Sequence, residues 1–348
     1  MNVKNFLFPL FFCSILLLST YVNVYATSES NNVEVGVFYY VWYNPADSAS
    51  WEYPKIHDKP VLGYYNSCDS AVIKQHLNWM SEARIDFLIV SWWGMYNQTM
   101  WDSFRNNATI QIFKTAKETV SNVKVCIMVE PFNETVNGYN YTEIYNYVYS
   151  TFYMNYPTVY FKYENKPLLL FYNAEILTAD GTVPEDNRFT VKIVGHCDYA
   201  EWIYDDVATT HKPNPPIPRE RQIPVSPRFD DYYVRNPNCT IDAKLEYLYR
   251  EQWERAVNLA QEGKIDIITI TSWNEFPERT AIEPHYDSTA SNRDPNYLFK
   301  LTKDYILQLK DPASVPANPW YENPRNYAIV MVLIGFCIVI GKWMYERF

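Results

Sequence analysis

Hydrophobic residues fall along this chain in two patterns, as short continuous runs and as longer stretches with helical spacing. The short runs are rich in β-branched and aromatic residues, which is typical of strands buried on both faces. Eight such runs are predicted as strands: residues 33–43, 85–93, 123–132, 167–172, 189–195, 202–204, 223–226 and 265–272. In the last run, the periodicity of residues 267–270 also fits a short core helix, and the β-branched content favours the strand.

The helical patterns lie between several of these runs. They cover residues 70–83, 103–120, 141–154, 242–262 and 296–309. Asp69 or Ser70 is suited to cap the first helix, while Thr240 and Gly263 are suited to begin and end the fourth. Strands that alternate with helices in one domain over residues 33–310 predict a (β/α)8 barrel, with an open doubly wound sheet as the alternative.

Apolar segments also lie at both ends of the chain. Residues 1–26 place Lys4 before an apolar stretch that ends in a small residue, and predict a signal peptide, with an uncleaved anchor as the alternative. Residues 327–345 predict a transmembrane helix after a linker at 311–326, with a buried terminal helix as the alternative. The expected protein is single-pass, in the secretory pathway or at the cell surface, with its main domain outside.

Composition narrows the classes of partner. A formal net charge of −10 argues against nucleic acid. The aromatic content of 17% exceeds the needs of a core, which is typical of either a sugar-binding platform or a Tyr-rich extracellular surface. Five N-x-S/T sequons suit an exported chain: Asn97, Asn107, Asn133, Asn140 and Asn238. Four cysteines allow one or two disulfides with open pairing, although Cys126 is predicted to be a buried thiol: Cys68, Cys126, Cys197 and Cys239.

Several reaction classes lack their sequence motifs. No H-x-x-H or H-E-x-x-H spacing occurs, so we expect no catalytic zinc and no cofactor. No G-x-S-x-G sequence supports serine hydrolysis. No G-x-G-x-x-G or P-loop is present, and with 9 glycines in the chain a phosphate cradle is not expected.

Polar and aromatic residues gather where the predicted strands end. They include Tyr40, Trp42, Trp92, Trp93, Glu130, Asp230, Asn274, Glu275 and Glu278. Because the carboxyl ends of barrel strands meet on one face, we expect an aromatic-walled cleft that contains several carboxylates. Glycoside hydrolysis needs such a site, with one acid to protonate the leaving oxygen and a second group to assist at the anomeric carbon.

Each of these residues also has a structural explanation. Glu130 could be the buried partner of a Lys or Arg, the Trp92–Trp93 pair could be core, and Asp230 with Asp231 could be a solvated loop. Glu275 and Glu278 are harder to explain in this way, because carboxylates at the end of a buried strand are costly unless they are used or paired.

Several segments between residues 35 and 310, taken together and in order, carry a family resemblance. They are residues 39–43 (YYVWY), 60–67 (PVLGYYNS), 86–94 (DFLIVSWWG), 129–132 (VEPF), 166–170 (KPLLL), 203–204 (IY), 272–278 (SWNEFPE) and 282–284 (IEP). In this order they resemble glycoside hydrolase family 99, the endo-α-mannosidases and their family-99-like relatives. The resemblance implies a (β/α)8 barrel that cleaves α-mannosidic linkages with retention and without metal.

The family's paired glutamates fall on Glu275 and Glu278. By the resemblance, Glu278 is the general acid/base and Glu275 is the base that helps the substrate's own 2-hydroxyl attack the anomeric carbon. Glu130, Tyr40 and Tyr204 match positions that the family uses to contact sugar. Phe276–Pro277 replaces the Trp-His that is usual in mannosidases of the family.

We therefore predict a retaining glycoside hydrolase that acts on α-mannosidic or related linkages in surface or exogenous glycans. The alternatives are a non-catalytic carbohydrate-binding surface protein and a transglycosylase on the same fold. The predicted catalytic residues are Glu275 and Glu278, whereas Glu283 is expected to brace the loop. The predicted substrate contacts are Glu130, Tyr40, Trp42, Trp92, Trp93, Tyr204, Asn274 and Asp230.

Overall fold

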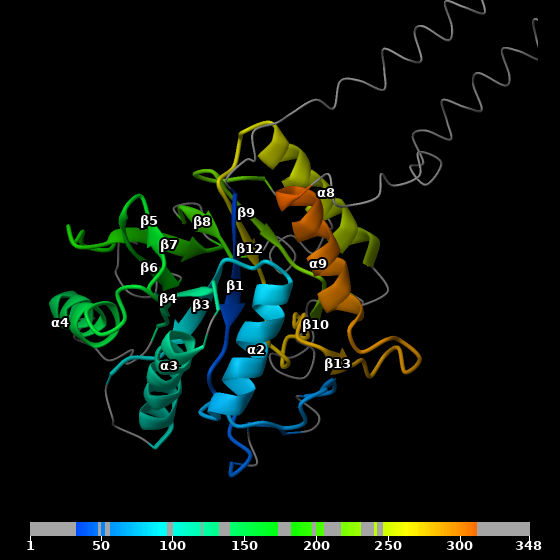
Figure 1. Ribbon diagram of the computed structural model, residues 1–348, viewed down its shortest axis with the longest axis horizontal. Helices are drawn as coiled ribbons and strands as arrows, with labels where there is room; N and C mark the ends of the chain where they lie inside the picture. Colours follow the sequence, from blue (N-terminus) through cyan, green and yellow to red (C-terminus); the bar gives the residue numbers. More distant parts are fainter. Residues whose placement is uncertain are drawn as a thin grey trace, which may run out of the picture.

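The computed structural model of the protein (Figure 1) describes most of the predicted domain. It covers residues 33–47, 50–52, 56–95, 100–119, 121–131, 140–172, 182–196, 200–204, 217–230, 240–241 and 246–311. Several predictions fall outside these ranges: the signal peptide, the transmembrane helix, all of the linker after Asp311, three sequons, Asp231, Cys197 and Cys239. No helix within the described ranges is both long enough and apolar enough to span a bilayer.

Eight parallel strands form the centre of the molecule. They are β1 (Glu34–Tyr39), β3 (Phe87–Trp92), β4 (Lys124–Val129), β6 (Lys166–Tyr172), β7 (Thr190–Gly195), β8 (Trp202–Ile203), β9 (Gln222–Val225) and β12 (Ile267–Ile270). They are hydrogen-bonded in the order β8-β7-β6-β4-β3-β1-β12-β9. Each overlaps a run predicted as a strand, although β6 and β9 begin one residue earlier than predicted. The nearly closed parallel barrel confirms the (β/α)8 architecture over the open sheet.

A side chain bridges the two end strands of this order. Gln222 is fully buried at the start of β9, and its Oε1 accepts from Ile203 N of β8 at 2.9 Å. Its Nε2 donates to Ile203 O at 3.0 Å and to Thr269 Oγ1 at 2.7 Å. The glutamine amide therefore supplies the hydrogen bonds that a backbone ladder would otherwise make between β8 and β9.

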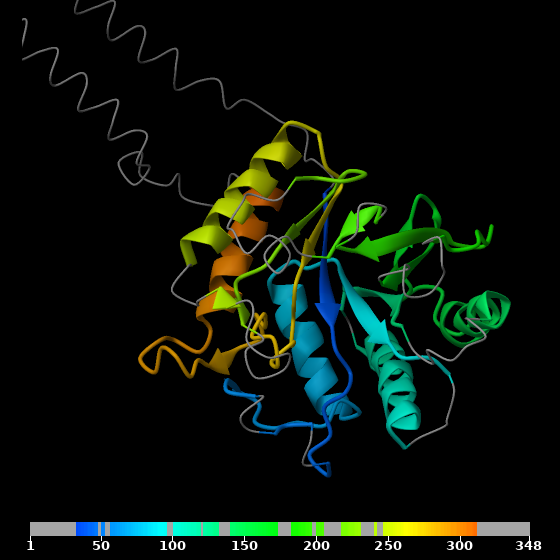
Figure 2. The same cartoon turned by 180° about the vertical axis from the view of Figure 1, so that it is seen from behind.

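Helices cover the outside of the barrel (Figures 1 and 2). They are α2 (Ser70–Glu82), α3 (Met100–Glu118), α4 (Tyr141–Tyr147) with the π-helical turn η1 (Val148–Tyr153), α8 (Glu246–Gln261) and α9 (Tyr297–Lys310). Helices α8 and α9 lie side by side in both views. Because helices cover one face and the barrel interior the other, every residue of β3 and β12 is buried.

The structure also tests the predicted helix ends. Asp69 caps α2, since its Oδ1 accepts from Ala71 N at 2.8 Å. Gly263, with φ +67°, follows α8 as predicted. Thr240, which was predicted to precede the fourth helix, pairs with Asp230 in a short ribbon, and α8 begins at Glu246.

Short strands complete the described part of the fold. The antiparallel pairs are β2 (Lys59–Pro60) with β13 (His285–Tyr286), β5 (Lys162–Tyr163) with β6, and β10 (Phe229–Asp230) with β11 (Thr240–Ile241). Gly36 in β1 is required by packing, because a Cβ there would lie 2.4 Å from the Phe87 ring. Cys126 is a fully buried thiol, as predicted, and Cys68 is a half-buried free thiol.

Candidate active site

The loop that follows β12 carries Glu275 and Glu278 and is folded tightly on itself. Glu275 N donates to Ser272 Oγ at 2.8 Å, and Ser272 Oγ is also 2.8 Å from Thr280 Oγ1. Thr280 N donates to Glu275 O at 3.2 Å, so the segment between Ser272 and Thr280 is a closed turn. Glu275 is 4% exposed and Glu278 9% exposed. The sequence therefore places two buried carboxylates at the carboxyl end of a barrel strand.

Three carboxylates surround one tyrosine at this end of the barrel. Burial raises the pKa of Tyr40 well above its usual value, and the charges of Glu275, Glu130 and Glu278 raise it further. The Tyr40 hydroxyl is hydrogen-bonded to the Tyr204 hydroxyl. Burial, followed by Glu278 and Glu275 among other groups, also raises the pKa of Tyr204. The ends of β1, β4, β8 and β12 thus bring these five predicted site residues together.

Glu130 is held by a hydroxyl group. Its Oε1 accepts from Ser91 Oγ at 2.7 Å, and Trp93 Nε1 donates to the same hydroxyl at 3.0 Å. Burial raises the pKa of Glu130 to about 7, with a further contribution from the charge of Glu278, while Ser91 and Arg105 oppose the rise. The carboxyl group can therefore be protonated or ionised near neutral pH.

Aromatic rings extend outwards from Tyr40. The Trp42 ring centroid lies 4.6 Å from that of Tyr40 and 6.1 Å from that of Trp93. Both tryptophans are half-buried, and the Arg105 guanidinium lies 4.6 Å above the Trp93 ring. These rings form an amphipathic surface beside the carboxylates, of the kind that sugar rings stack on.

Sequence reasoning missed three residues that flank this group. Tyr172 is the last residue of β6, and its ring centroid lies 5.1 Å from that of Tyr204. His196 directly follows β7, and its ring centroid lies 5.6 Å from that of Tyr204. Their place at strand carboxyl ends is a signal that could have found them. Arg105 comes from α3, where nothing in the local sequence distinguishes it from an ordinary surface arginine.

Trp92 lies on the other side of the strand. Successive side chains of β3 point to opposite faces, so Ser91 and Trp93 face the carboxylates and Trp92 faces the helices. Trp92 is fully buried, its Nε1 donates to Asn106 Oδ1 at 3.0 Å, and its ring stacks on Tyr147. The predicted substrate contact is therefore corrected for Trp92, which packs in the core.

Asn274 holds backbone groups. Its Oδ1 accepts from Tyr40 N at 2.8 Å, and its Nδ2 donates to Tyr40 O at 3.0 Å and to Tyr65 OH at 3.1 Å. Its own carbonyl accepts from Tyr43 OH at 2.6 Å. Because the side chain is fully buried and engaged within the protein, we assign Asn274 a positioning role in place of the predicted substrate contact.

Asp230 belongs to a cluster of charges behind Glu278. Its Oδ2 pairs with Arg279 Nη1 at 3.1 Å, and its backbone N donates to Glu278 O at 2.9 Å. Arg279 Nε also bonds Asp58 Oδ2 at 3.1 Å, while its carbonyl accepts from Arg228 Nε at 2.6 Å. The structure therefore places Asp230 in an ion pair that anchors the loop, not in the solvated loop that was the alternative for it.

The charged side chains of this cluster are buried and form ion pairs with one another. Arg228 bonds Asp58 at 2.6 Å and Asp287 at 2.8 Å, and its Nη2 donates to His285 Nε2 at 3.0 Å. Burial would raise the pKa of Asp58, but the charges of Arg228 and Arg279 outweigh it and hold that pKa well below its usual value. Burial and Arg228 lower the pKa of His285, so this ring is neutral near pH 7.

Known proteins resemble this chain in part of its sequence and in its fold. The model of glycosyl hydrolase family 99 matches residues 55–182. The chain is a relative of glycoside hydrolase family 99. It is either a member or a family-99-like protein, as the resemblance in its sequence implied. No curated protein sequence matches the chain.

Solved structures share the fold of this family-99 relative. Two are structures of the GH99 endo-alpha-mannosidase from Bacteroides thetaiotaomicron, one of them with Bis-Tris propane bound. They are 22% and 20% identical, each has a TM-score of 0.60, and they cover 82% and 83% of this chain and 99% and 100% of their own. A glycoside hydrolase-like protein is 14% identical with a TM-score of 0.51, covering 80% of this chain and 95% of its own.

Phe276–Pro277 is where the sequence differs from the family pattern that it otherwise resembles, and the structure shows the surroundings of Phe276. Phe276 is fully buried, and its ring packs near Tyr43, Trp51 and His285 at centroid distances of 6.0, 5.8 and 5.9 Å. The phenylalanine therefore fills the space between the loop and its aromatic surroundings.

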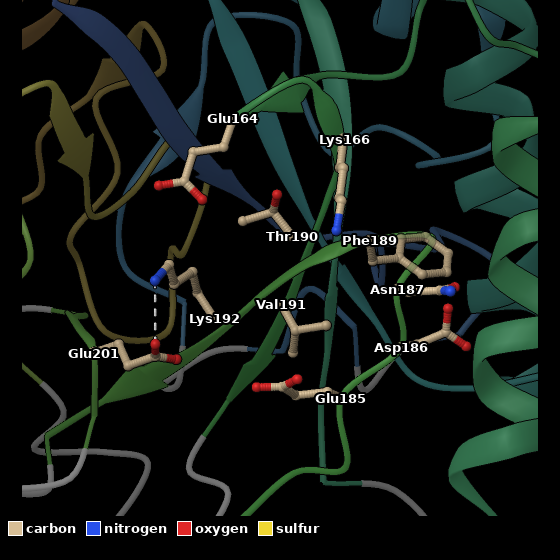
Figure 3. A pocket seen from close by; sticks show the side chains of 10 residues that line it. All are labelled: Glu164, Lys166, Glu185, Asp186, Asn187, Phe189, Thr190, Val191, Lys192 and Glu201. Atoms are coloured by element: carbon tan, nitrogen blue, oxygen red, sulfur yellow. Dashed lines mark hydrogen bonds and ion pairs between the residues drawn. The ribbon is translucent and has the colours of Figure 1, made fainter.

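A cavity of 710 Å³ is lined by residues other than those of the candidate site (Figure 3). Lys166 and Thr190, the first residues of β6 and β7, line it, so it opens at the amino end of these strands. The Lys192 ammonium in its wall pairs with Glu201 at 3.1 Å, as Figure 3 shows, and with Glu220 at 2.6 Å. Barrel enzymes react at the carboxyl end, so this cavity is not assigned to the candidate site.

Proposed function

We propose that this protein is a retaining glycoside hydrolase that cleaves α-mannosidic or related linkages in surface or exogenous glycans. The observation that carries the proposal is the convergence of Glu130, Glu275 and Glu278 around Tyr40 and Tyr204 at the carboxyl end of the barrel. The relation to family 99 supports the same class of reaction.

In the proposed first step, Glu275 assists the attacking oxygen and Glu278 assists the departing oxygen. Glu275 takes the proton of the sugar 2-hydroxyl, and that oxygen attacks the anomeric carbon. Glu278 gives a proton to the departing glycosidic oxygen. The products are a 1,2-anhydro sugar and the released alcohol, and the anomeric centre is inverted once.

In the second step, the same two groups reverse their roles. Glu278, now ionised, takes a proton from a water molecule that opens the anhydro ring at the anomeric carbon. Glu275 returns its proton to the 2-oxygen. The second inversion gives net retention, and an alcohol in place of water would give transglycosylation.

Substrate orientation is assigned to the groups around the pair. The partly protonated carboxyl of Glu130 can exchange hydrogen bonds with sugar hydroxyls in either state, since its pKa is about 7. Trp42 and Trp93 offer half-buried rings beside it. We place this domain outside the membrane, tethered by the apolar segment at residues 327–345.

The test compares the purified full-length protein with its Glu278→Gln variant on α-mannosides and on a panel of mannose-containing glycans. We expect the variant to bind sugar but to release no oligosaccharide detectable by mass spectrometry. Glu82→Gln, the same change on the exposed surface of α2, should cleave at the normal rate. An unimpaired Glu278→Gln protein would refute the assignment, and sugar binding without turnover by the wild type would identify the carbohydrate-binding alternative.

A further inference from the structure

A chain of buried polar contacts runs behind the proposed base, and hydrogen bonds make up all of it except the contact between His76 and Glu283. It starts at the Tyr39 hydroxyl, which lies 2.9 Å from His76 Nδ1, and His76 Nε2 lies 3.2 Å from Glu283 Oε1. Glu283 Oε2 accepts from Tyr65 OH at 2.8 Å. Tyr65 OH accepts from Asn274 Nδ2, and the Asn274 amide bonds both backbone groups of Tyr40. These contacts therefore lead from Tyr39, the last residue of β1, to Tyr40, the residue that follows it.

The hydrogen bonds on one side of Glu283 run towards it. Asn274 Nδ2 donates to Tyr65 OH, which donates to Glu283 Oε2. On the other side, His76 Nε2 is close to Glu283 Oε1 but makes an ionic contact without hydrogen-bond geometry. Glu283 is fully buried, so Tyr65 holds its carboxyl group away from water.

These contacts join the end of β1, the segment around α2 and the loop after β12, which are separate in the sequence. Tyr39 ends β1, Tyr65 precedes α2, His76 lies within α2, and Glu283 follows the loop of the paired glutamates. The Glu283 backbone is held as well, since its N donates to Trp273 O at 2.9 Å and its carbonyl lies 2.6 Å from His285 Nδ1. Any displacement of Glu283 is therefore transmitted to the ends of β1 and β12.

We propose that Glu283 is a positioning residue that fixes Glu275 and Tyr40 through Tyr65 and Asn274. Asn274 directly precedes Glu275, and the Tyr40 side chain lies among the three carboxylates. A buried side chain held by hydrogen bonds is costly to displace, because its polar atoms would lose their partners away from water. The proposal rests on the proposed function only for its catalytic consequence.

The first test removes single hydroxyl groups from the full-length protein. Tyr65→Phe deletes the link between Glu283 and Asn274 and keeps the ring packing. We expect kcat to fall about 10- to 100-fold, with KM changed less than about threefold, because a small displacement of a reacting group slows catalysis strongly. The matched control is Tyr160→Phe, which removes an equally buried hydroxyl that donates to Leu168 O at 3.1 Å. Its kcat should stay normal.

The second test does not depend on turnover. The Tyr40 amide donates to Asn274 Oδ1, so its hydrogen exchange reports directly on the position of that side chain. Tyr65→Phe and Glu283→Gln should each accelerate exchange in a peptide covering Tyr40 more than about tenfold, while Tyr160→Phe should not.

The outcomes separate the two proposals. A wild-type protein without glycosidase activity would refute the proposed function, and exchange at Tyr40 would then decide the positioning role alone. Unchanged exchange in both Tyr65→Phe and Glu283→Gln would overturn the positioning role. In an active protein, normal kcat in Tyr65→Phe would overturn it as well.

Discussion

Replacing Glu130 with glutamine removes a single ionisable group from the candidate site and preserves its shape. The side chain is 5% exposed, and its Oε1 accepts from Ser91 Oγ at 2.7 Å, a bond that a glutamine oxygen can keep. Glu130→Gln therefore changes the charge of the site with little change in packing. The effect should depend on pH, because the carboxyl group titrates near neutrality in the folded protein.

The sign and size of this effect follow from the raised pKa. The pKa of Glu130 is about 7 in the folded protein, against 4.5 as its ordinary value. The unfolded chain loses the proton first, so the folded state loses relative stability as the pH rises from about 4.5 through 7. At about 1.4 kcal/mol for each pH unit, the loss attributable to this one group is about 3 kcal/mol as an upper bound.

Urea denaturation of the wild type and Glu130→Gln between pH 4.5 and 8.5 measures this loss. The two proteins should differ little at pH 4.5, and the variant should be the more stable at pH 8.5 by as much as about 3 kcal/mol. Glu34→Gln is the matched control, since burial and Asp86 raise the pKa of Glu34 to about 7 at the opposite end of the barrel. Its effect should be smaller because Glu34 is half-exposed to water. A difference between wild type and Glu130→Gln that is the same at every pH would refute the reasoning.

Three further predictions test other parts of the structure. Gln222→Met should lower the free energy of unfolding by about 2–4 kcal/mol, measured in urea, because it leaves the Ile203 backbone groups buried and unpaired. Asp58→Asn should lower it by about 3–5 kcal/mol in the same assay, because Arg228 loses a buried partner. Trp92→Ala should cost about 3–5 kcal/mol in stability and leave sugar binding nearly unchanged, whereas Trp93→Ala should chiefly weaken binding in calorimetric titration. Similar behaviour of the two tryptophan variants would contradict the alternation of side chains along β3.

The barrel could be predicted from the sequence because its strands carry a local signal. Most of these runs are buried on both faces, so apolar character continues through them with few polar interruptions. Strand β7 is an exception, since Lys192 and its two neighbours are only half-buried. The short strands β8 and β9 were found in the same way. The role of Gln222 could not be found, since a polar residue at the start of a strand carries no sign that its amide will replace a missing ladder to β8.

The location of the carboxylates followed from barrel geometry, but the role of each neighbour depended on side-chain direction. Trp92 and Trp93 are adjacent and chemically identical, and only the register of β3 decides that the first packs against helices. Asn274 was predicted from its position beside Glu275. Its actual bonds are to Tyr40, 234 residues away, a contact that no local pattern contains.

The sequence indicated that Glu283 braces the loop, but it could not indicate which residues Glu283 contacts. Its partners Tyr65 and His76 lie more than 200 residues earlier in the chain, and they meet it only when β1 and β12 pair to complete the barrel. Glu283 is fully buried and accepts from Tyr65 OH, so moving it would break a hydrogen bond in a dry interior. The same pairing of β1 with β12 that brings Tyr40 to Glu275 therefore also builds the network that holds them. In this protein, closure of the barrel and positioning of the proposed base are one structural event.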